Sequence, residues 1–250
     1  VYLTYTKNLK EEGPVVATTL ARGRLEGKAL VDVKELLECD SWAGDGGSGS
    51  RLAWGKDGML YMTTGASNGT TAQEGTSLRG KILRLTDEGK AAPGNPFEGR
   101  AGFRPEIYSM GHRNSLALVV HPVTGELWND ENGPNGGDEV NLIKPGKNYG
   151  WPVVSYGRDY GGPRISDNPY REGWELPVVF WVPAIAVSGK PFHRSRFVTL
   201  MHEKPIYIQY TTSAFGFVGR SVFQRALFPL KSYIQSMVTD DLVTKKAGVF

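Results

Sequence analysis

The residues best suited to chemistry in this sequence lie between Gly111 and Tyr160. The run Gly111-His112-Arg113-Asn114 places a permanent cation beside an amide that can both donate and accept hydrogen bonds, just before an expected strand. Further along, residues 147–152 and 156–160 carry tyrosine and tryptophan rings. Because such rings can stack on a planar ligand, this stretch predicts a binding site.

An acidic loop, residues 129–139, separates these two groups and holds four acids, three glycines, three asparagines and one proline. Carboxylate, amide and backbone carbonyl oxygens suit a hard cation such as Ca²⁺, and glycine and proline leave the carbonyls free to point at it. The spacing does not match an EF-hand. From composition alone, a solvated turn, an ordinary ion pair at Arg113 and core packing of Tyr149 and Trp151 remain alternatives.

Short segments rich in β-branched and aromatic residues recur between turn signals, which is typical of strands. The only helix-like period before residue 199 is short and lies near Val31 to Leu37. The sequence therefore predicts an all-β protein. The expected strands include residues 1–5, 15–19, 51–54, 59–62, 81–85 and 178–181.

Residues 52–61 and 118–128 resemble one another, since each reads as a strand, a tight turn ending in glycine and a second strand. Gly58 and Gly125 would supply the positive φ that hairpin loops need. Repeated hairpins at long spacing favour the blades of a β-propeller with insertions. The pattern alone also permits a β-sandwich.

Composition excludes several classes of protein. The chain has 250 residues, 40% hydrophobic and 22% charged, which argues against disorder. No segment approaches the roughly 18 consecutive apolar residues of a membrane-spanning helix. The net charge of +3 arises within residues 199–250, so residues 1–198 are formally neutral and no nucleic-acid groove is indicated. The single cysteine, Cys39, is expected to be a small buried hydrophobe.

Several motifs in matching order resemble the glucose/sorbosone dehydrogenase family, whose members are quinoproteins that use pyrroloquinoline quinone (PQQ). The resemblance covers roughly Val1 to Phe197. The motifs are Gly111-His112-Arg113-Asn114, residues 132–141, Asn148-Tyr149-Gly150-Trp151-Pro152, and the shorter segments 49–52, 79–84, 95–97 and 183–189.

The resemblance implies a six-bladed β-propeller of the soluble quinoprotein glucose dehydrogenase type. It implies oxidation of an aldose at its anomeric carbon to a lactone, with electrons passed to an external acceptor. It also implies a periplasmic or secreted protein, although the chain opens at Val1 without a leader.

For the quinone, the resemblance implies contacts from Arg113 and Asn114, with Tyr160 at a further cofactor-contacting position. A guanidinium near the quinone oxygens would stabilise the negative charge that develops on reduction, which gives Arg113 a catalytic role. His112 belongs to the same motif and is expected to orient this loop.

For the metal, the resemblance implies calcium in the acidic loop. Gly133 and Pro134 match carbonyls near the cofactor, and Glu139 and Tyr149 match a metal-binding pair. Calcium beside a quinone carbonyl would act as a Lewis acid.

The sequence departs from the family at the general base. Many members carry a histidine just before the Gly-Ser-Arg segment, where this chain has Gly47. Asp45 is the candidate substitute, because a base must lie near the sugar hydroxyl with a suitable pKa. The loss of the histidine favours the alternative of a non-catalytic or truncated propeller that binds carbohydrate or a protein partner.

The resemblance also implies an incomplete propeller, because the first part of the family pattern is missing and similarity ends near Phe197. Residues 1–198 are expected to form the blades, and residues 199–250 a divergent, glycine-poor tail.

Overall fold

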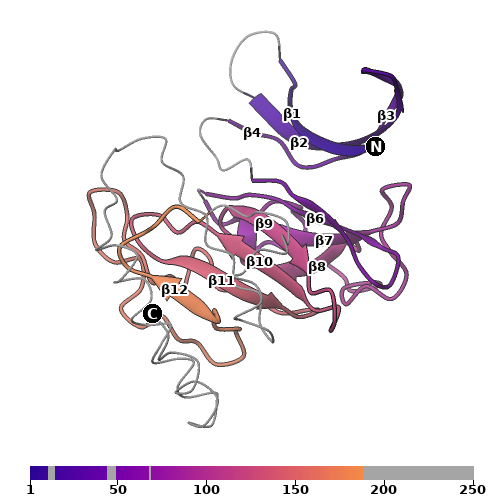
Figure 1. Ribbon diagram of the computed structural model, residues 1–250. Coiled ribbons are helices and arrows are strands. Elements are labelled where there is room, and N and C mark those ends of the chain that lie inside the picture. The colour runs from indigo at the N-terminus through magenta and orange to yellow at the C-terminus, as the bar shows by residue number, and fades with distance from the viewer. Residues whose placement is uncertain (11–14, 44–48, 68, 188–250) are drawn as a thin grey trace, which may run out of the picture. The chain divides into compact units, whose positions relative to one another are not determined.

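The computed structural model describes residues 1–10, 15–43, 49–67 and 69–187 (Figure 1). The chain divides into two compact units, Val1–Tyr210 and Thr211–Phe250, and every described residue belongs to the first. The expected tail, 199–250, lies outside the described residues, and its boundary stays a prediction.

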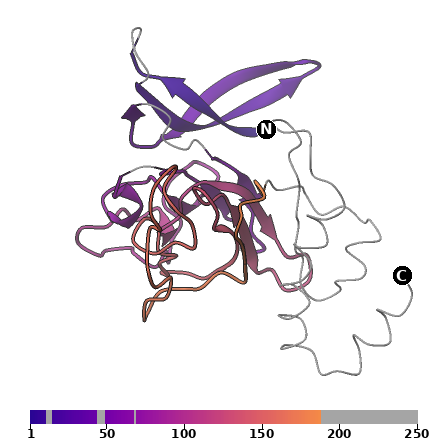
Figure 2. The ribbon, with the colours of Figure 1, turned by 90° about the vertical axis from the view of Figure 1, so that its left-hand side faces the viewer.

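Strands dominate the described residues, which form three antiparallel sheets of four strands each (Figures 1 and 2). The helix present among them is a single 3₁₀ turn, η1 (Thr71–Gln73). The all-β prediction is confirmed. In the same part of the chain, no helix has the length and apolar character needed to cross a bilayer.

The first sheet pairs strands in the order β1-β2-β3, and β4 pairs with the start of β2. The short helix-like period near Val31 to Leu37 falls within strand β3, in agreement with the all-β prediction. Strand β3 pairs with the long strand β2 over most of its length, with two irregularities in the register. The strands are β1 (Tyr2–Asn8), β2 (Val15–Glu26), β3 (Ala29–Glu38) and β4 (Trp42–Ala43).

The second and third sheets are consecutive meanders, each strand pairing with the next along the chain. The two predicted hairpins, β5–β6 and β9–β10, are confirmed, and Gly58 (φ 75°) and Gly125 (φ 81°) adopt the left-handed backbone that their turns require. The strands of the second sheet are β5 (Leu52–Trp54), β6 (Leu60–Thr63), β7 (Lys81–Leu85) and β8 (Ile107–Met110). Those of the third are β9 (Ser115–Val120), β10 (Leu127–Glu131), β11 (Asp138–Ile143) and β12 (Val179–Trp181).

The second sheet is buried on both faces. Strand β6 presents Leu60 and Met62 to a core shared with the first sheet, where Leu20 and the buried Cys39 lie. Its alternate residue, Tyr61, packs in a separate core with side chains of the third sheet. The first strands of the two meanders, β5 and β9, also contact each other. Four-stranded meanders stacked face to face with neighbouring first strands are the arrangement of propeller blades.

Strand direction brings the chemically interesting loops to one end of these sheets. Consecutive strands of a meander are antiparallel, so β5, β7, β9 and β11 begin at the same end, where β6, β8, β10 and β12 finish. The link 111–114 between β8 and β9 and the loop 132–137 between β10 and β11 therefore meet there.

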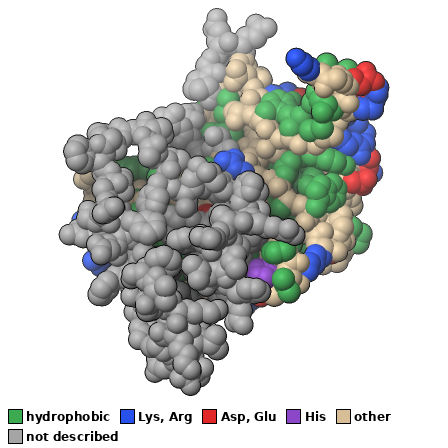
Figure 3. Space-filling model, in the orientation of Figure 1, with side chains coloured by type: hydrophobic (Ala, Val, Ile, Leu, Met, Phe, Trp, Pro, Cys, Tyr) green, Lys and Arg blue, Asp and Glu red, His purple; other side chains and the backbone are tan. Residues whose placement is uncertain are grey.

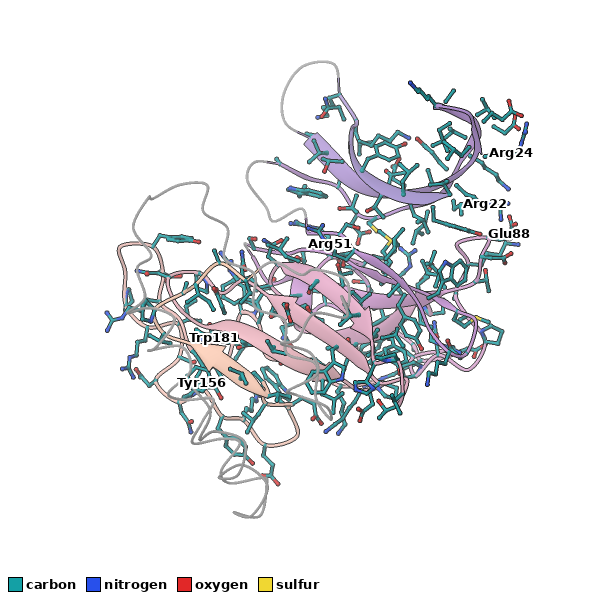
Figure 4. All side chains as sticks on the ribbon, viewed as in Figure 1. Arg22, Arg24, Arg51, Glu88, Tyr156 and Trp181 are labelled. Carbon is teal, nitrogen blue, oxygen red and sulfur yellow. The ribbon has the colours of Figure 1, made fainter. Side chains whose placement is uncertain are left out.

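Charged side chains of both signs lie on the described surface. Figure 3 shows basic and acidic side chains interspersed on the visible described face. Several form ion pairs, including Lys7 with Glu35 at 2.7 Å and Arg22 with Glu88 at 2.8 Å, the latter pair labelled in Figure 4.

A buried lysine ties the second sheet to the turn η1. Lys81 has no solvent exposure, and its Nζ donates to the carbonyl oxygens of Thr71 (2.7 Å), Ala72 (3.1 Å) and Arg79 (2.7 Å). The Lys81 nitrogen thus meets three acceptors, which offset part of the cost of burying it, and burial lowers the pKa of Lys81 to about 7.

We expect Lys81→Met to lower the free energy of unfolding by about 2–5 kcal/mol, because the apolar stem is kept while three buried carbonyls lose their donor. Urea unfolding of this variant against Lys90→Met, at an exposed lysine, measures the difference. Equal stabilities of the two variants would contradict the role assigned to Lys81.

Candidate functional site

Arg113 lies at the shared end of the sheets and is 7% exposed. Its Nη1 donates to the carbonyl oxygens of Asn132 (3.0 Å) and Gly133 (2.8 Å), and its guanidinium carbon lies 5.1 Å from the centre of the Trp151 ring. Its Nε is buried without a hydrogen-bond partner. The guanidinium therefore has donor capacity left for a ligand.

Hydrogen bonds to a neighbouring loop fix the indole under this cation. Trp151 Nε1 donates to the Ala66 carbonyl at 2.7 Å, and the Ala66 amide donates to the Arg113 carbonyl at 2.7 Å. The stacked pair of Arg113 and Trp151 is thus anchored on both sides to one residue of the loop after β6.

Asn114 joins the segment before β5 to the acidic loop. Its Oδ1 accepts from the Gly49 amide at 3.0 Å, and its carbonyl accepts from the Asn132 amide at 3.1 Å. A Cβ at Gly49 would lie 2.6 Å from both Asn114 Oδ1 and the Ser115 carbonyl, so this close approach requires glycine.

Asp138 joins the acidic loop to the segment after β12. Its side chain is buried, and it accepts from the amides of Gly133 (2.9 Å), Ile185 (2.8 Å) and Ala186 (2.7 Å). Ala186 has a φ of 54°, a conformation that costs energy for a residue with a Cβ and that these contacts support. Burial raises the pKa of Asp138, while the backbone donors act in the opposite direction.

Two further carboxylates, Glu131 and Glu139, face each other across the β10–β11 ladder, and both are buried. Glu131 is hydrogen-bonded to His112 Nδ1 at 2.8 Å, whereas Glu139 accepts only from Asn141 Nδ2 at 3.2 Å. Burial, and then the neighbouring charge of Glu131, raise the pKa of Glu139 well above its usual value. A divalent cation would relieve this repulsion.

Within the described residues, no group of three or more His, Cys, Asp or Glu side chains is arranged to hold a metal ion. A cation here would depend on carbonyl and amide oxygens beside Glu139, a donor set that suits Ca²⁺. Asn132 Oδ1, which is buried without a partner, is one such oxygen. The Gly133 carbonyl already accepts from Arg113, so Arg113 and a cation would share it.

The other described residues expected at the site are Pro134, Tyr149 and Tyr160. Pro134 lies in the loop between β10 and β11. The Tyr149 hydroxyl donates to the Leu142 carbonyl (2.7 Å) and accepts from the Lys144 amide (2.9 Å), so in this structure the phenol is bonded to the backbone. Tyr160 is 76% exposed, and in the described part of the chain neither a hydrogen bond nor a ring contact joins it to Arg113. Their roles toward a cofactor stay predictions.

Asp45, the candidate base, and Gly47 lie outside the described residues. The first described residue after them, Gly49, donates its amide to Asn114 Oδ1.

Two residues of this region, Glu131 and Asp138, were not singled out from the sequence. Both are among the four acids of the loop, and both fall in strands, where charged residues are unusual on a buried face. The observed register places Glu131 opposite Glu139, one residue away from the pairing with Asp138 that a loop of residues 132–137 would give.

Comparisons with known proteins now define the class. The structure superposes with a TM-score of 0.69 on the soluble aldose sugar dehydrogenase from Escherichia coli in the apo form, at 33% identity over 78% of this chain and 57% of that one. For the PQQ-bound form of aldose sugar dehydrogenase from Streptomyces coelicolor the TM-score is 0.53, at 32% identity over 76% and 52% of the two chains. Aldose sugar dehydrogenase YliI of E. coli K12 is 41% identical over 150 residues, 59% of this chain and 40% of that protein.

Fold and sequence thus agree on an all-β chain of the sugar dehydrogenase type. The family model for glucose/sorbosone dehydrogenase matches residues 1–206, and the chain belongs to this family, as its motifs predicted. The chain spans roughly half the length of the relatives it matches.

Asp130 is the neighbour of Glu131 in strand β10. Because successive side chains of a strand alternate, its side chain lies on the opposite face of the third sheet from Glu131. It is 6% exposed, and burial raises its pKa to about 7. The folded state therefore binds a proton that the unfolded state has released near pH 4.

We expect the stability contributed by Asp130 to be full below about pH 4 and to be lost as the pH rises through about 7, a difference of at most about 4 kcal/mol. Asp130→Asn should remove this part of the pH dependence. Urea unfolding in EDTA at several pH values between 4 and 8 compares the two proteins. Parallel stability curves would show that Asp130 does not titrate in this range.

Proposed function

We propose that this chain is part of a PQQ- and calcium-dependent oxidoreductase that oxidises an aldose at its anomeric carbon to a lactone and passes the electrons to an external acceptor. We further propose that its sheets are blades of a six-bladed propeller. The location that accompanies this function in the resemblance is the periplasm or the cell exterior. Membership of the glucose/sorbosone dehydrogenase family supports the reaction class.

The environment of Arg113 is the observation that best supports the proposal. Its guanidinium is buried, and its hydrogen bonds go to uncharged carbonyls rather than to a carboxylate, so within the described residues its positive charge is not neutralised by an ion pair. A charge held in this way attracts an anionic, planar ligand and stabilises negative charge on it. Trp151 covers one face of the guanidinium and excludes water there.

When bound, the quinone would supply the acceptor for two electrons from the sugar, and Ca²⁺ would supply Lewis acidity beside it. Arg113 and Asn114 would hold the quinone, with Tyr160 as a further contact. The acidic loop would hold the cation through Gly133, Pro134, Glu139 and Tyr149. The uncompensated Glu139 carboxylate supports a cation at this place.

A general base must take the proton from the sugar hydroxyl. Gly47 cannot accept a proton, so we assign the role to Asp45, whose segment reaches the site at Gly49. If this assignment is wrong, the chain has a cofactor site without a base, and the alternative of a non-catalytic propeller that binds carbohydrate or a protein partner follows.

Reconstitution with PQQ and Ca²⁺ tests the function, with the absorption of the quinone followed before and after a panel of aldoses is added. Reduction of bound quinone by a sugar would establish the dehydrogenase. Binding without reduction would support the non-catalytic alternative, and absence of binding would overturn the cofactor assignment.

We expect Arg113→Ala to weaken quinone binding by about 10- to 100-fold, because a charge-assisted contact is lost from a desolvated site. Fluorescence titration with PQQ in the presence of Ca²⁺ measures this. The matched control is Arg171→Ala, which removes an exposed arginine that also stacks on a tryptophan, Trp174, at 4.5 Å. Equal affinities of the two variants would argue against Arg113 as a ligand.

We expect Glu139→Gln to be at least as stable as the wild type without metal at pH 7–8, because it removes a buried charge that Glu131 repels. The same variant should lose the rise in melting temperature that Ca²⁺ gives the wild type. Thermal unfolding with EDTA or Ca²⁺ measures both effects, and the exposed Glu172→Gln serves as control. A retained calcium response would remove Glu139 from the cation site.

A further inference from the structure

His112 is the fully buried centre of a hydrogen-bonded chain of side chains. It has no exposed surface, and its ring stacks on Tyr149 with centroids 4.7 Å apart. Its Nε2 lies 2.9 Å from Ser109 Oγ, and its Nδ1 lies 2.8 Å from Glu131 Oε2. Because neither Ser109 nor His112 reaches solvent, this serine-histidine-carboxylate arrangement has no access to a substrate and is not a nucleophilic site.

The Glu131 carboxylate joins this chain to the backbone of Arg113. One oxygen, Oε2, bonds to His112, and the other, Oε1, accepts from the Arg113 amide at 3.3 Å. Asn129 Nδ2 also donates to Oε2 at 3.3 Å. A carboxylate is only an acceptor, so His112 donates to Glu131 from Nδ1.

We propose that His112 is a positioning residue for Arg113, and that it acts only through its Nδ1–H bond to Glu131. The proposal rests on the function proposed above, in which Arg113 holds the quinone. With its amide bonded to Glu131 and its carbonyl to Ala66, the Arg113 backbone is fixed on both sides. The guanidinium lies several bonds from that backbone, so a small rotation there would displace it from Trp151 and from the loop carbonyls.

A purely structural histidine and a positioning histidine differ in what their two nitrogens do. A packing role depends on the size of the ring and its stacking on Tyr149, and these do not distinguish Nδ1 from Nε2. The proposed role depends on Nδ1 alone. Two amide substitutions separate these cases, since the side-chain nitrogen of asparagine lies close to the position of Nδ1 and that of glutamine close to the position of Nε2.

We therefore expect His112→Asn to keep the bond to Glu131 and His112→Gln to lose it. In titrations with PQQ and Ca²⁺, affinity should fall about 10- to 100-fold in His112→Gln and stay within about threefold of wild type in His112→Asn. If packing alone matters, the larger glutamine should be the better replacement, and the order of the two variants would reverse.

A second measurement needs no cofactor. The Arg113 backbone amide resonance, observed by ¹⁵N–¹H NMR of the quinone-free protein, should move in His112→Gln and stay near its wild-type position in His112→Asn. The control is His121→Gln, at a buried histidine whose Nδ1 accepts from the Val123 and Thr124 amides in the β9–β10 turn. It should change neither the Arg113 resonance nor the quinone affinity.

Glu131→Gln tests the same link from the other side and remains available if His112→Gln does not fold. It should move the Arg113 resonance and weaken quinone binding as His112→Gln does. An unmoved Arg113 resonance in both variants overturns the positioning role. A third outcome is that the Arg113 resonance moves in the variants while the wild-type chain binds no quinone. That outcome keeps the link from His112 to Arg113 but refutes the proposed cofactor function and, with it, the role of His112 toward the quinone.

Discussion

The alternating direction of the strands is the constraint on which the site depends. Residues 49, 113, 133 and 185 are far apart in sequence, yet each follows or precedes a strand at the same end of a meander. Antiparallel pairing within each sheet places its turns at common ends, so side-chain contacts between the turns are not needed to bring them there. Side-chain contacts then join neighbouring loops, as Asn114 does for the segment before β5 and Asp138 for the segment after β12.

This arrangement buries charged groups, which costs free energy, and hydrogen bonds offset that cost to different extents at Asp138, Glu131 and Glu139. Asp138 accepts from backbone amides of two loops, which offset part of the desolvation that raises its pKa, and Glu131 bonds to a histidine and a backbone amide. Glu139 has one amide donor and a like charge opposite, and its raised pKa reflects that imbalance. The least compensated acid is therefore the one at which a cation would gain most.

The sequence predicted the class of fold better than the contacts among the residues expected at the site. Gly58 and Gly125 marked the two hairpins because a tight turn needs positive φ, a local requirement. The short helix-like period near Val31 to Leu37 has no counterpart in the structure, because the long neighbouring strand β2, which lies outside that window, pairs with β3. Likewise the hydroxyl of Tyr149 could not be assigned from spacing, since its partners Leu142 and Lys144 depend on how the chain turns after β11. Glu131 was missed because its importance arises from register with Glu139.

The contrast between Arg113 and the buried Lys81 shows why one of these two cations suits a ligand and the other does not. Lys81 gives all three of its donors to carbonyls and has no donor left, so its role is to hold a turn. Arg113 gives one nitrogen to two carbonyls, while its Nε has no partner. Glu131, the nearby acid, bonds to the backbone amide of Arg113. Had Glu131 paired with the Arg113 guanidinium, the positive charge would be neutralised and the N–H donors of the guanidinium would be occupied. By bonding to the backbone, the carboxylate holds the arginine in position and leaves its charge available to an anionic group.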